Sequence, residues 1–140
     1  MEIPKKTDIL RLIPQREPMV LVSGLHSVEE NAVSTFLRIE EENIFVRDGK
    51  LLESGIIENI AQSAAAMNGY RSLAGGEPVL NGYIGAIKNL EISRLPECGT
   101  LLVTRVIETY KVMDASIIEA EVRSGDLLVA RCEMKVFMQE

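Results

Sequence analysis

The sequence has few of the residues from which metal centres and disulfide frameworks are built. Its 140 residues include one histidine, two cysteines and no tryptophan. Cys98 and Cys132 match no metal-ligand spacing, and with His26 as the only histidine no zinc cluster can be assembled. We therefore expect reduced thiols, no bound metal and no cofactor.

Long apolar runs and basic clusters are missing as well. No stretch approaches the roughly 18 apolar residues of a membrane span, and residues 1–6 lack the apolar core of a secretory signal. A cytoplasmic protein with no membrane partner is therefore expected. The 15 basic residues are outnumbered by 21 acidic ones, and no basic cluster or aromatic platform occurs. Nucleic acid is thus not an expected partner.

What is present is typical of one globular domain, which we place at residues 1–140. Apolar residues make up 46% of the chain, enough for an ordinary core at this length. Near the start, Thr7 or Asp8 can cap a short helix over residues 9–13 that Pro14 ends. This helix is predicted to act as a lid.

Strands are predicted where apolar residues alternate with polar ones. The apolar run at residues 18–22 and the alternation over residues 33–39 predict a hairpin with its turn at 29–31. Four more strands are separated by short loops, which require antiparallel neighbours. They cover residues 79–93, 101–113, 116–123 and 126–138.

Between these strands the pattern changes to one long helix over residues 51–72, ended by the pair Gly75-Gly76. Apolar residues surround this helix almost completely, so it should be buried. It is also the only element able to cover the apolar face of the sheet. The sequence therefore predicts an α+β protein with the hotdog fold, an antiparallel sheet wrapped around a long central helix. The pattern alone also permits another α+β sandwich.

A polar stripe interrupts the apolar surface of the predicted helix. Ser54, Glu58 and Gln62 are four residues apart and share one face, with Asn59 and Ser63 in the adjacent row. An unpaired carboxylate in an apolar environment costs several kcal/mol. Glu58 is therefore paired, hydrogen-bonded to Gln62 or exposed, or its burial lets it exchange a proton with a bound substrate.

Three blocks of the sequence resemble the 3-hydroxyacyl-acyl-carrier-protein dehydratases of the hotdog superfamily. They are LIPQREPMVLV at residues 12–22, ENIAQ at 58–62 with the alanine run after it, and GYIGAIK at 82–88 leading into CGTL at 98–101. Together the blocks span nearly the whole chain in the family's order. The sequence is most similar to the divergent branch related to the dehydratases of aryl polyene and flexirubin pigment clusters.

The resemblance implies dehydration of a 3-hydroxyacyl thioester, carried by an acyl-carrier protein, to the trans-2-enoyl thioester in fatty acid or polyene-type biosynthesis. It implies Glu58 as the catalytic carboxylate and Gln62 as the residue that orients it. The site would lie at the interface of a homodimer or higher even oligomer, or of a heterodimer with another hotdog subunit.

The histidine of that family is missing here. Its usual segment before the helix corresponds to residues 41–50, which contain none, and Gln15 replaces the histidine of the opening block. Glutamine cannot act as acid or base, so Gln15 is expected to position a water molecule or hold the thioester. His26 is expected to be structural or exposed. A dehydratase of this composition would have to use Glu58 for both proton transfers.

Two alternatives stay open. The missing histidine also fits a non-catalytic subunit that binds the acyl carrier and pairs with an active hotdog partner. The other alternative is an acyl thioesterase, in which Glu58 activates water and backbone N–H groups near Gly55 and Ile56 hold the oxyanion.

Overall fold

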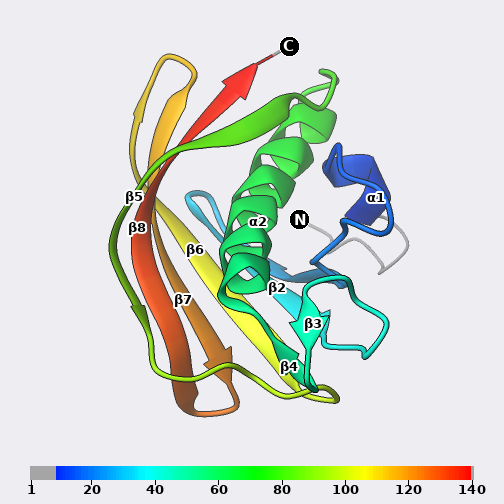
Figure 1. The fold of residues 1–140 in the computed structure, drawn as a ribbon. Helices are drawn as coiled ribbons and strands as arrows, with labels where there is room; N and C mark the ends of the chain where they lie inside the picture. Colours follow the sequence, from blue (N-terminus) through cyan, green and yellow to red (C-terminus); the bar gives the residue numbers. More distant parts are fainter. Residues whose placement is uncertain (1–8, 140) are drawn as a thin grey trace.

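A curved antiparallel sheet surrounds one long helix in the part of the chain that the structure describes, residues 9–139 (Figure 1). The sheet has six strands in the order β1-β2-β6-β7-β8-β5, and β3 pairs with β4 in a separate hairpin. The elements of this computed structural model are, in chain order, α1 (Ile9–Leu12), β1 (Gly24–Val28), β2 (Ala32–Arg38), β3 (Val46–Arg47), β4 (Lys50–Leu51), α2 (Glu53–Ala74), β5 (Asn81–Ile92), β6 (Leu101–Val112), β7 (Ala115–Ser124) and β8 (Leu127–Gln139).

The helix α2 lies against the concave face of the sheet, and α1 lies on the opposite side of α2 (Figure 1). Neighbouring strands are antiparallel throughout the sheet. The strand order places the early hairpin β1-β2 beside β6, so the sheet joins strands that precede α2 in the sequence to strands that follow it. The predicted hotdog fold is confirmed.

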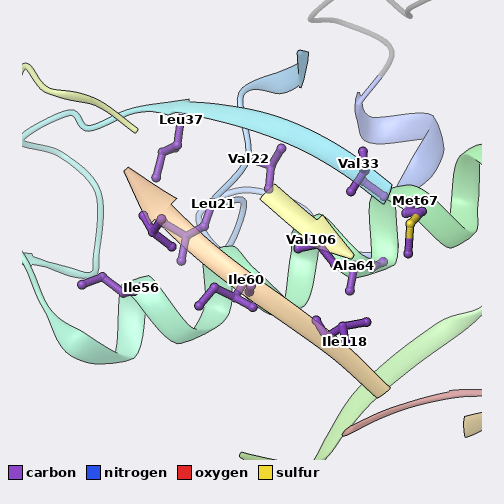
Figure 2. Close-up of a cluster of buried hydrophobic side chains, with 14 of the residues drawn as sticks. Leu21, Val22, Val33, Leu37, Ile56, Ile60, Ala64, Met67, Val106 and Ile118 are labelled. Carbon is purple, nitrogen blue, oxygen red and sulfur yellow. The ribbon is translucent and has the colours of Figure 1, made fainter. Parts of the chain in front are cut away.

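The core lies between α2 and the sheet (Figure 2). Ile56, Ile60, Ala64 and Met67 of α2 are each at most 1% exposed, and their spacing of three or four residues places them on one side of the helix. Val106 of β6 is fully buried beside them. The prediction of a buried helix is therefore confirmed for this side of α2.

The ends of α2 differ slightly from the prediction. The helix begins at Glu53, because Leu51 belongs to β4 and pairs with Val46. At the other end, the N–H of Gly75 donates to the carbonyl of Arg71 at 3.0 Å. The next residue, Gly76, has a φ of 72°, a left-handed conformation that glycine adopts without steric cost. The predicted glycine stop is confirmed.

The last turn of α2 is tied to the sheet through Arg71. Its guanidinium lies 3.2 Å from a carboxylate oxygen of Glu108 on β6 and donates to the carbonyl of Glu30 at 2.6 Å. The other carboxylate oxygen of Glu108 accepts from the hydroxyl of Ser116 on β7 at 2.9 Å. Because Glu108 is only 12% exposed, these partners supply the hydrogen bonds that its burial requires.

The segment at residues 18–22 is not a strand, and this part of the predicted hairpin is wrong. The hairpin is formed instead by β1 and β2, which pair Gly24 with Phe36. Residues 18 and 19 lie in a turn and residues 20–22 in neither helix nor strand, and the partners of the Leu21 backbone are side chains of α2 rather than a neighbouring strand. Apolar content alone could not reveal this difference.

The hairpin β3-β4 was not predicted, although the sequence carries its signal. Asp48 and Gly49 form the two-residue turn with φ values of 53° and 75°. Asp-Gly is among the preferred pairs for a turn that needs positive φ at both positions. The flanking strands have only two residues each, too few to show an alternating pattern.

The convex face of the sheet carries a row of alternating charges. Arg105 on β6 is opposite Glu121 on β7, which is opposite Arg131 on β8. Arg131 is in turn opposite Glu91 on β5, and their side chains form an ion pair at 2.5 Å. Opposite charges at facing positions stabilise strand pairs modestly. The row includes one of the exposed positions that alternate with buried ones along each of β7 and β8.

The short helix α1 packs closely on α2 at Gly69. Ile9 and Leu12 of α1 are buried, and a Cβ placed on Gly69 would overlap the carbonyl oxygen and carbonyl carbon of Leu12. Glycine is therefore required at Gly69 by the close approach of a second backbone. The predicted caps Thr7 and Asp8 lie outside the described residues, and the lid function of this helix stays a prediction.

We expect Gly69→Ala to destabilise the protein by about 2–3 kcal/mol, because the added methyl group meets a backbone carbonyl that cannot turn away. Urea unfolding at fixed protein concentration measures the change. Gly75→Ala is the matched control, since a Cβ there meets its nearest atom at 3.5 Å, and its free energy of unfolding should change by less than about 0.5 kcal/mol. An equal loss in both variants would contradict the close approach.

The buried thiol of Cys132 should make stability fall at alkaline pH. Burial raises the pKa of this thiol from 9.0 to about 11, and the residue is 6% exposed. Between these two values the unfolded chain loses a proton that the folded chain keeps, so the unfolded state is favoured as pH rises. The thiol's effect is absent below about pH 9 and reaches up to about 2 kcal/mol by pH 11.

Urea unfolding of wild type and Cys132→Ala at pH 8, 9, 10 and 11 tests this expectation. The variant should start less stable, because it leaves a small cavity, yet should decline less steeply than wild type above pH 9. Cys98→Ala is the control for loss of a thiol and should keep the wild-type decline. Parallel curves for wild type and Cys132→Ala would rule out the proposed effect.

Candidate functional site

The polar stripe of α2 is buried in the structure except at Glu58 and Ser54. Gln62 and Ser63 are fully buried, and Asn59 is 1% exposed. Glu58 is half-buried and Ser54 is exposed. Buried amides and hydroxyls are tolerated only when they are hydrogen-bonded, so their partners define what this stripe holds in place.

Gln62 joins the segment before β1 to the carboxylate of Glu58. Its side-chain oxygen accepts from the backbone N–H of Leu21 at 2.7 Å. Its side-chain nitrogen donates to the carbonyl of Met19 at 2.7 Å and to Oε2 of Glu58 at 2.9 Å. Because the oxygen must face the N–H of Leu21, the amide has one orientation, and both of its N–H donors are used.

The carboxylate of Glu58 is thus held by one oxygen. Its side chain is half-buried rather than enclosed as expected, because Ile57, Glu58 and Ala61 lie on the part of α2 that this chain covers only partly. Within residues 9–139, no ion pair is formed by Glu58. The contact with Gln62 was expected for a structural and for a catalytic role, so the contact alone does not separate the two.

Asn59 and Ser63 form the adjacent row and bind the sheet. Asn59 donates from its side-chain nitrogen to the carbonyl of Leu21 at 2.7 Å, and its oxygen accepts from the hydroxyl of Thr104 at 2.5 Å. Ser63 shares a hydrogen bond with the hydroxyl of Thr35 at 2.7 Å. Both polar groups of the Leu21 backbone are therefore bound by side chains of α2.

The sequence reasoning identified the row of Asn59 and Ser63 but assigned it no partner, and it missed Thr104 altogether. The available signal was the presence of two amides, Asn59 and Gln62, in a helix that is otherwise apolar. Apart from Glu58, which binds Gln62, their side-chain partners lie more than 35 positions away in the chain, and nothing in the local pattern identifies such contacts.

Gly55 and Ile56 lie in the first turns of α2, where they were expected. Their N–H groups both donate to the carbonyl of Leu52, at 2.9 and 3.1 Å. In this conformation both groups are already engaged within the helix, which argues against their holding an oxyanion. Gly55 has a packing reason to be glycine, because a Cβ there would lie 2.6 Å from Leu51 and 2.8 Å from Phe45.

Gln15 and His26 are not brought into the hydrogen-bonded cluster around Glu58. Gln15 is half-buried, and its side-chain oxygen is enclosed without a hydrogen-bond partner. His26 is exposed on β1, at an irregularity in the pairing between Leu25 and Ser27. The expectation that His26 is structural or exposed is confirmed as exposure, whereas the role of Gln15 stays a prediction.

A cavity of about 610 Å³ opens beside α1. It lies between α1, the segment at residues 17–23 and the end of β2, and Val20 and Leu37 give it part of its apolar lining. Glu58 does not line it. Among residues 9–139, no group of three or more histidine, cysteine or acidic residues is placed to hold a metal ion, and no described helix is long and apolar enough to cross a membrane.

Comparison with known proteins gives the family of the chain. A sequence model described as ApeP-like, ApeP dehydratase, matches residues 7–140. The chain belongs to the ApeP-like dehydratase family. No curated protein sequence matches the chain. The match covers the helix with Glu58 and Gln62 and confirms the predicted resemblance to the aryl polyene type of dehydratase.

Solved structures share the fold of this ApeP-like chain at low sequence identity. The dehydratase heterocomplex ApeI:P from Xenorhabdus doucetiae matches with a TM-score of 0.89 and 17% identity, over 94% of this chain and 91% of that chain. An uncharacterized protein from Pyrococcus horikoshii, PH1136, matches with a TM-score of 0.70 and 15% identity, over 100% and 96%. A hypothetical thioesterase with coenzyme A from Streptococcus pneumoniae matches with a TM-score of 0.65 and 7% identity, over 96% of this chain and 97% of that chain.

Proposed function

We propose that this ApeP-like chain is a dehydratase subunit that converts a 3-hydroxyacyl thioester to the trans-2-enoyl thioester. The observation that carries the proposal is the carboxylate of Glu58, held at 2.9 Å by Gln62 on the helix that the dehydratase family model covers. A carboxylate fixed on a rigid helix is suited to proton transfer, since geometry decides the efficiency of a general base.

The bonds made by Gln62 leave one oxygen of Glu58 for chemistry. Oε2 accepts from Gln62, and Oε1 takes the proton from C2 of the substrate. The electron pair of that C–H bond forms the C2–C3 double bond, and the C3–O bond breaks. The protonated carboxyl group returns its proton to the departing hydroxyl, which leaves as water, and Glu58 is again a carboxylate.

The acyl group is proposed to arrive on an acyl-carrier protein in polyene-type biosynthesis, which is the setting of the aryl polyene dehydratases that the sequence resembles. The thioesterase alternative has less support, because the N–H groups of Gly55 and Ile56 are already bonded to Leu52. A thioesterase needs donors directed at the oxyanion rather than at a helix carbonyl.

Glu58→Gln should lower dehydratase activity at least about a hundredfold, since glutamine keeps the shape but cannot exchange the proton. Its side-chain oxygen can still accept from Gln62, so the melting temperature should stay within about 2 °C of wild type. Glu53→Gln is the matched control, an exposed carboxylate in the first turn of the same helix, and should keep full activity. Formation of the enoyl thioester from a synthetic 3-hydroxyacyl thioester measures the rate.

A second hotdog subunit is the partner that the structure favours. Ile57, Glu58 and Ala61 are only half-buried on α2. β5 is the last strand at one end of the described sheet, and its Tyr83 is 47% exposed. Exposed strand edges are normally covered. The ApeI:P relative is a heterocomplex by description, which supports a different subunit as the partner of this chain.

The partner would also supply the second titratable group. If Glu58 is the only acid or base at the site, it must carry out both proton transfers. A well-placed general acid or base typically raises the reaction rate by about 10²–10⁴-fold. A hotdog partner that places a histidine beside Glu58 would let one residue act as the base and the other as the acid. The non-catalytic alternative differs only in that Glu58 would then contribute nothing.

We expect light scattering of the purified chain to give twice 15.5 kDa or an even multiple.

Co-expression with a histidine-bearing hotdog subunit from the same gene cluster should yield a mixed assembly that is at least about tenfold more active than either chain alone. Glu58→Gln in the mixed assembly decides the remaining alternative. Unchanged activity there would mean that this chain only binds and assembles, whereas a monomer of 15.5 kDa under all conditions would remove the shared site.

A further inference from the structure

Two buried threonines stand side by side on the sheet and bind α2 in different ways. Thr35 on β2 and Thr104 on β6 are directly opposite each other, and they are 0% and 1% exposed. Thr35 binds the hydroxyl of Ser63 at 2.7 Å, whereas Thr104 donates to the amide oxygen of Asn59 at 2.5 Å. The two residues therefore have the same chemistry and burial but different connections.

The bond from Thr104 continues toward Glu58 through the side-chain amide of Asn59, whereas the bond of Thr35 continues through Ser63 to the backbone carbonyl of Asn59 at 2.7 Å, within α2. The carbonyl of Leu21 can only accept, so the amide nitrogen of Asn59 faces it at 2.7 Å, and the amide oxygen faces Thr104, whose hydroxyl donates to it. The N–H of Leu21 then donates to Gln62, which donates to Glu58. Five residues from three separate parts of the chain are joined in one hydrogen-bonded series.

We propose that Thr104 and Asn59 are positioning residues for the dehydration, acting through Leu21 and Gln62 on the carboxylate of Glu58. The inference rests on the proposed function, because it concerns the same carboxylate. Neither residue touches the reacting atoms. Their contribution is to keep the segment at residues 19–21 in place against α2, so that the amide of Gln62 has only one direction in which to donate.

The geometry makes the series sensitive to the loss of its first member. Without the hydroxyl of Thr104, the buried amide oxygen of Asn59 loses its donor, which costs free energy, and a side-chain shift that relieves this cost weakens the bond from the amide nitrogen to the carbonyl of Leu21. Residues 18–22 have no strand pairing of their own, so the bonds from α2 are what hold Leu21. A shift of Leu21 then displaces Gln62 and the carboxylate that it holds.

Thr104→Val keeps the shape of the side chain and removes only the hydroxyl. In the assembled enzyme we expect kcat to fall about tenfold or more with KM within about twofold, because misplacement of a catalytic group by a fraction of an ångström already costs rate. Thr104→Ser restores the hydroxyl and should recover kcat to within about threefold of wild type. Thr35→Val is the matched control, with a similar loss of melting temperature but wild-type kcat.

Hydrogen exchange of the Leu21 amide tests the connection without any activity. In the purified full-length chain, Thr104→Val should exchange this proton at least about tenfold faster than wild type, whereas Thr35→Val and Thr104→Ser should not. Equal exchange in Thr104→Val and Thr35→Val would overturn the proposal even if kcat had fallen. Faster exchange together with a wild type that dehydrates no thioester would reject the proposed function and leave the hydrogen-bonded connection standing.

Discussion

The arrangement of the site depends on one contact, the binding of the Leu21 backbone by two amides of α2. Gln62 accepts the N–H of Leu21 and Asn59 donates to its carbonyl, both at 2.7 Å. These bonds replace the strand pairing that residues 18–22 do not have. They also place the opening block of the family resemblance directly on the helix that carries the ENIAQ block, so that two motifs separated by more than 35 residues become one structure.

Most of the fold could be predicted from the sequence, because apolar residues recur at regular intervals within its helix and strands. The alternation along β8 and the apolar circumference of α2 each reflect burial directly, and the predicted strands β5 to β8 agree with the structure to within two residues. The strand predicted at residues 18–22 is wrong, because an apolar run does not reveal whether its backbone is hydrogen-bonded to a strand or to side chains. The hairpin at Asp48-Gly49 was too short to show a pattern.

Within the site, only the contacts between residues of the same helix could be predicted from the sequence. The interval of four residues correctly places Gln62 beside Glu58, since residues on one turn of a helix meet by geometry. Thr104 could not be found in this way, because its contact with Asn59 depends on which strand crosses α2 and at what register. The half-buried state of Glu58 was also beyond the sequence, since it depends on how much of α2 one chain can cover.

The charged row on the convex face has a consequence for how the sheet assembles. If β8 slid by two residues along β7 in one direction, Glu121 would come to face Glu133 instead of Arg131. That pairing is repulsive, whereas the native register sets Glu121 against Arg131, although it also leaves Glu119 opposite Glu133. A slide by one residue would turn the apolar side chains outward. The alternation of buried and exposed side chains therefore excludes a slide by one residue, whereas the charged row disfavours a slide by two residues in one direction only, since the opposite slide would set Glu119 against Arg131.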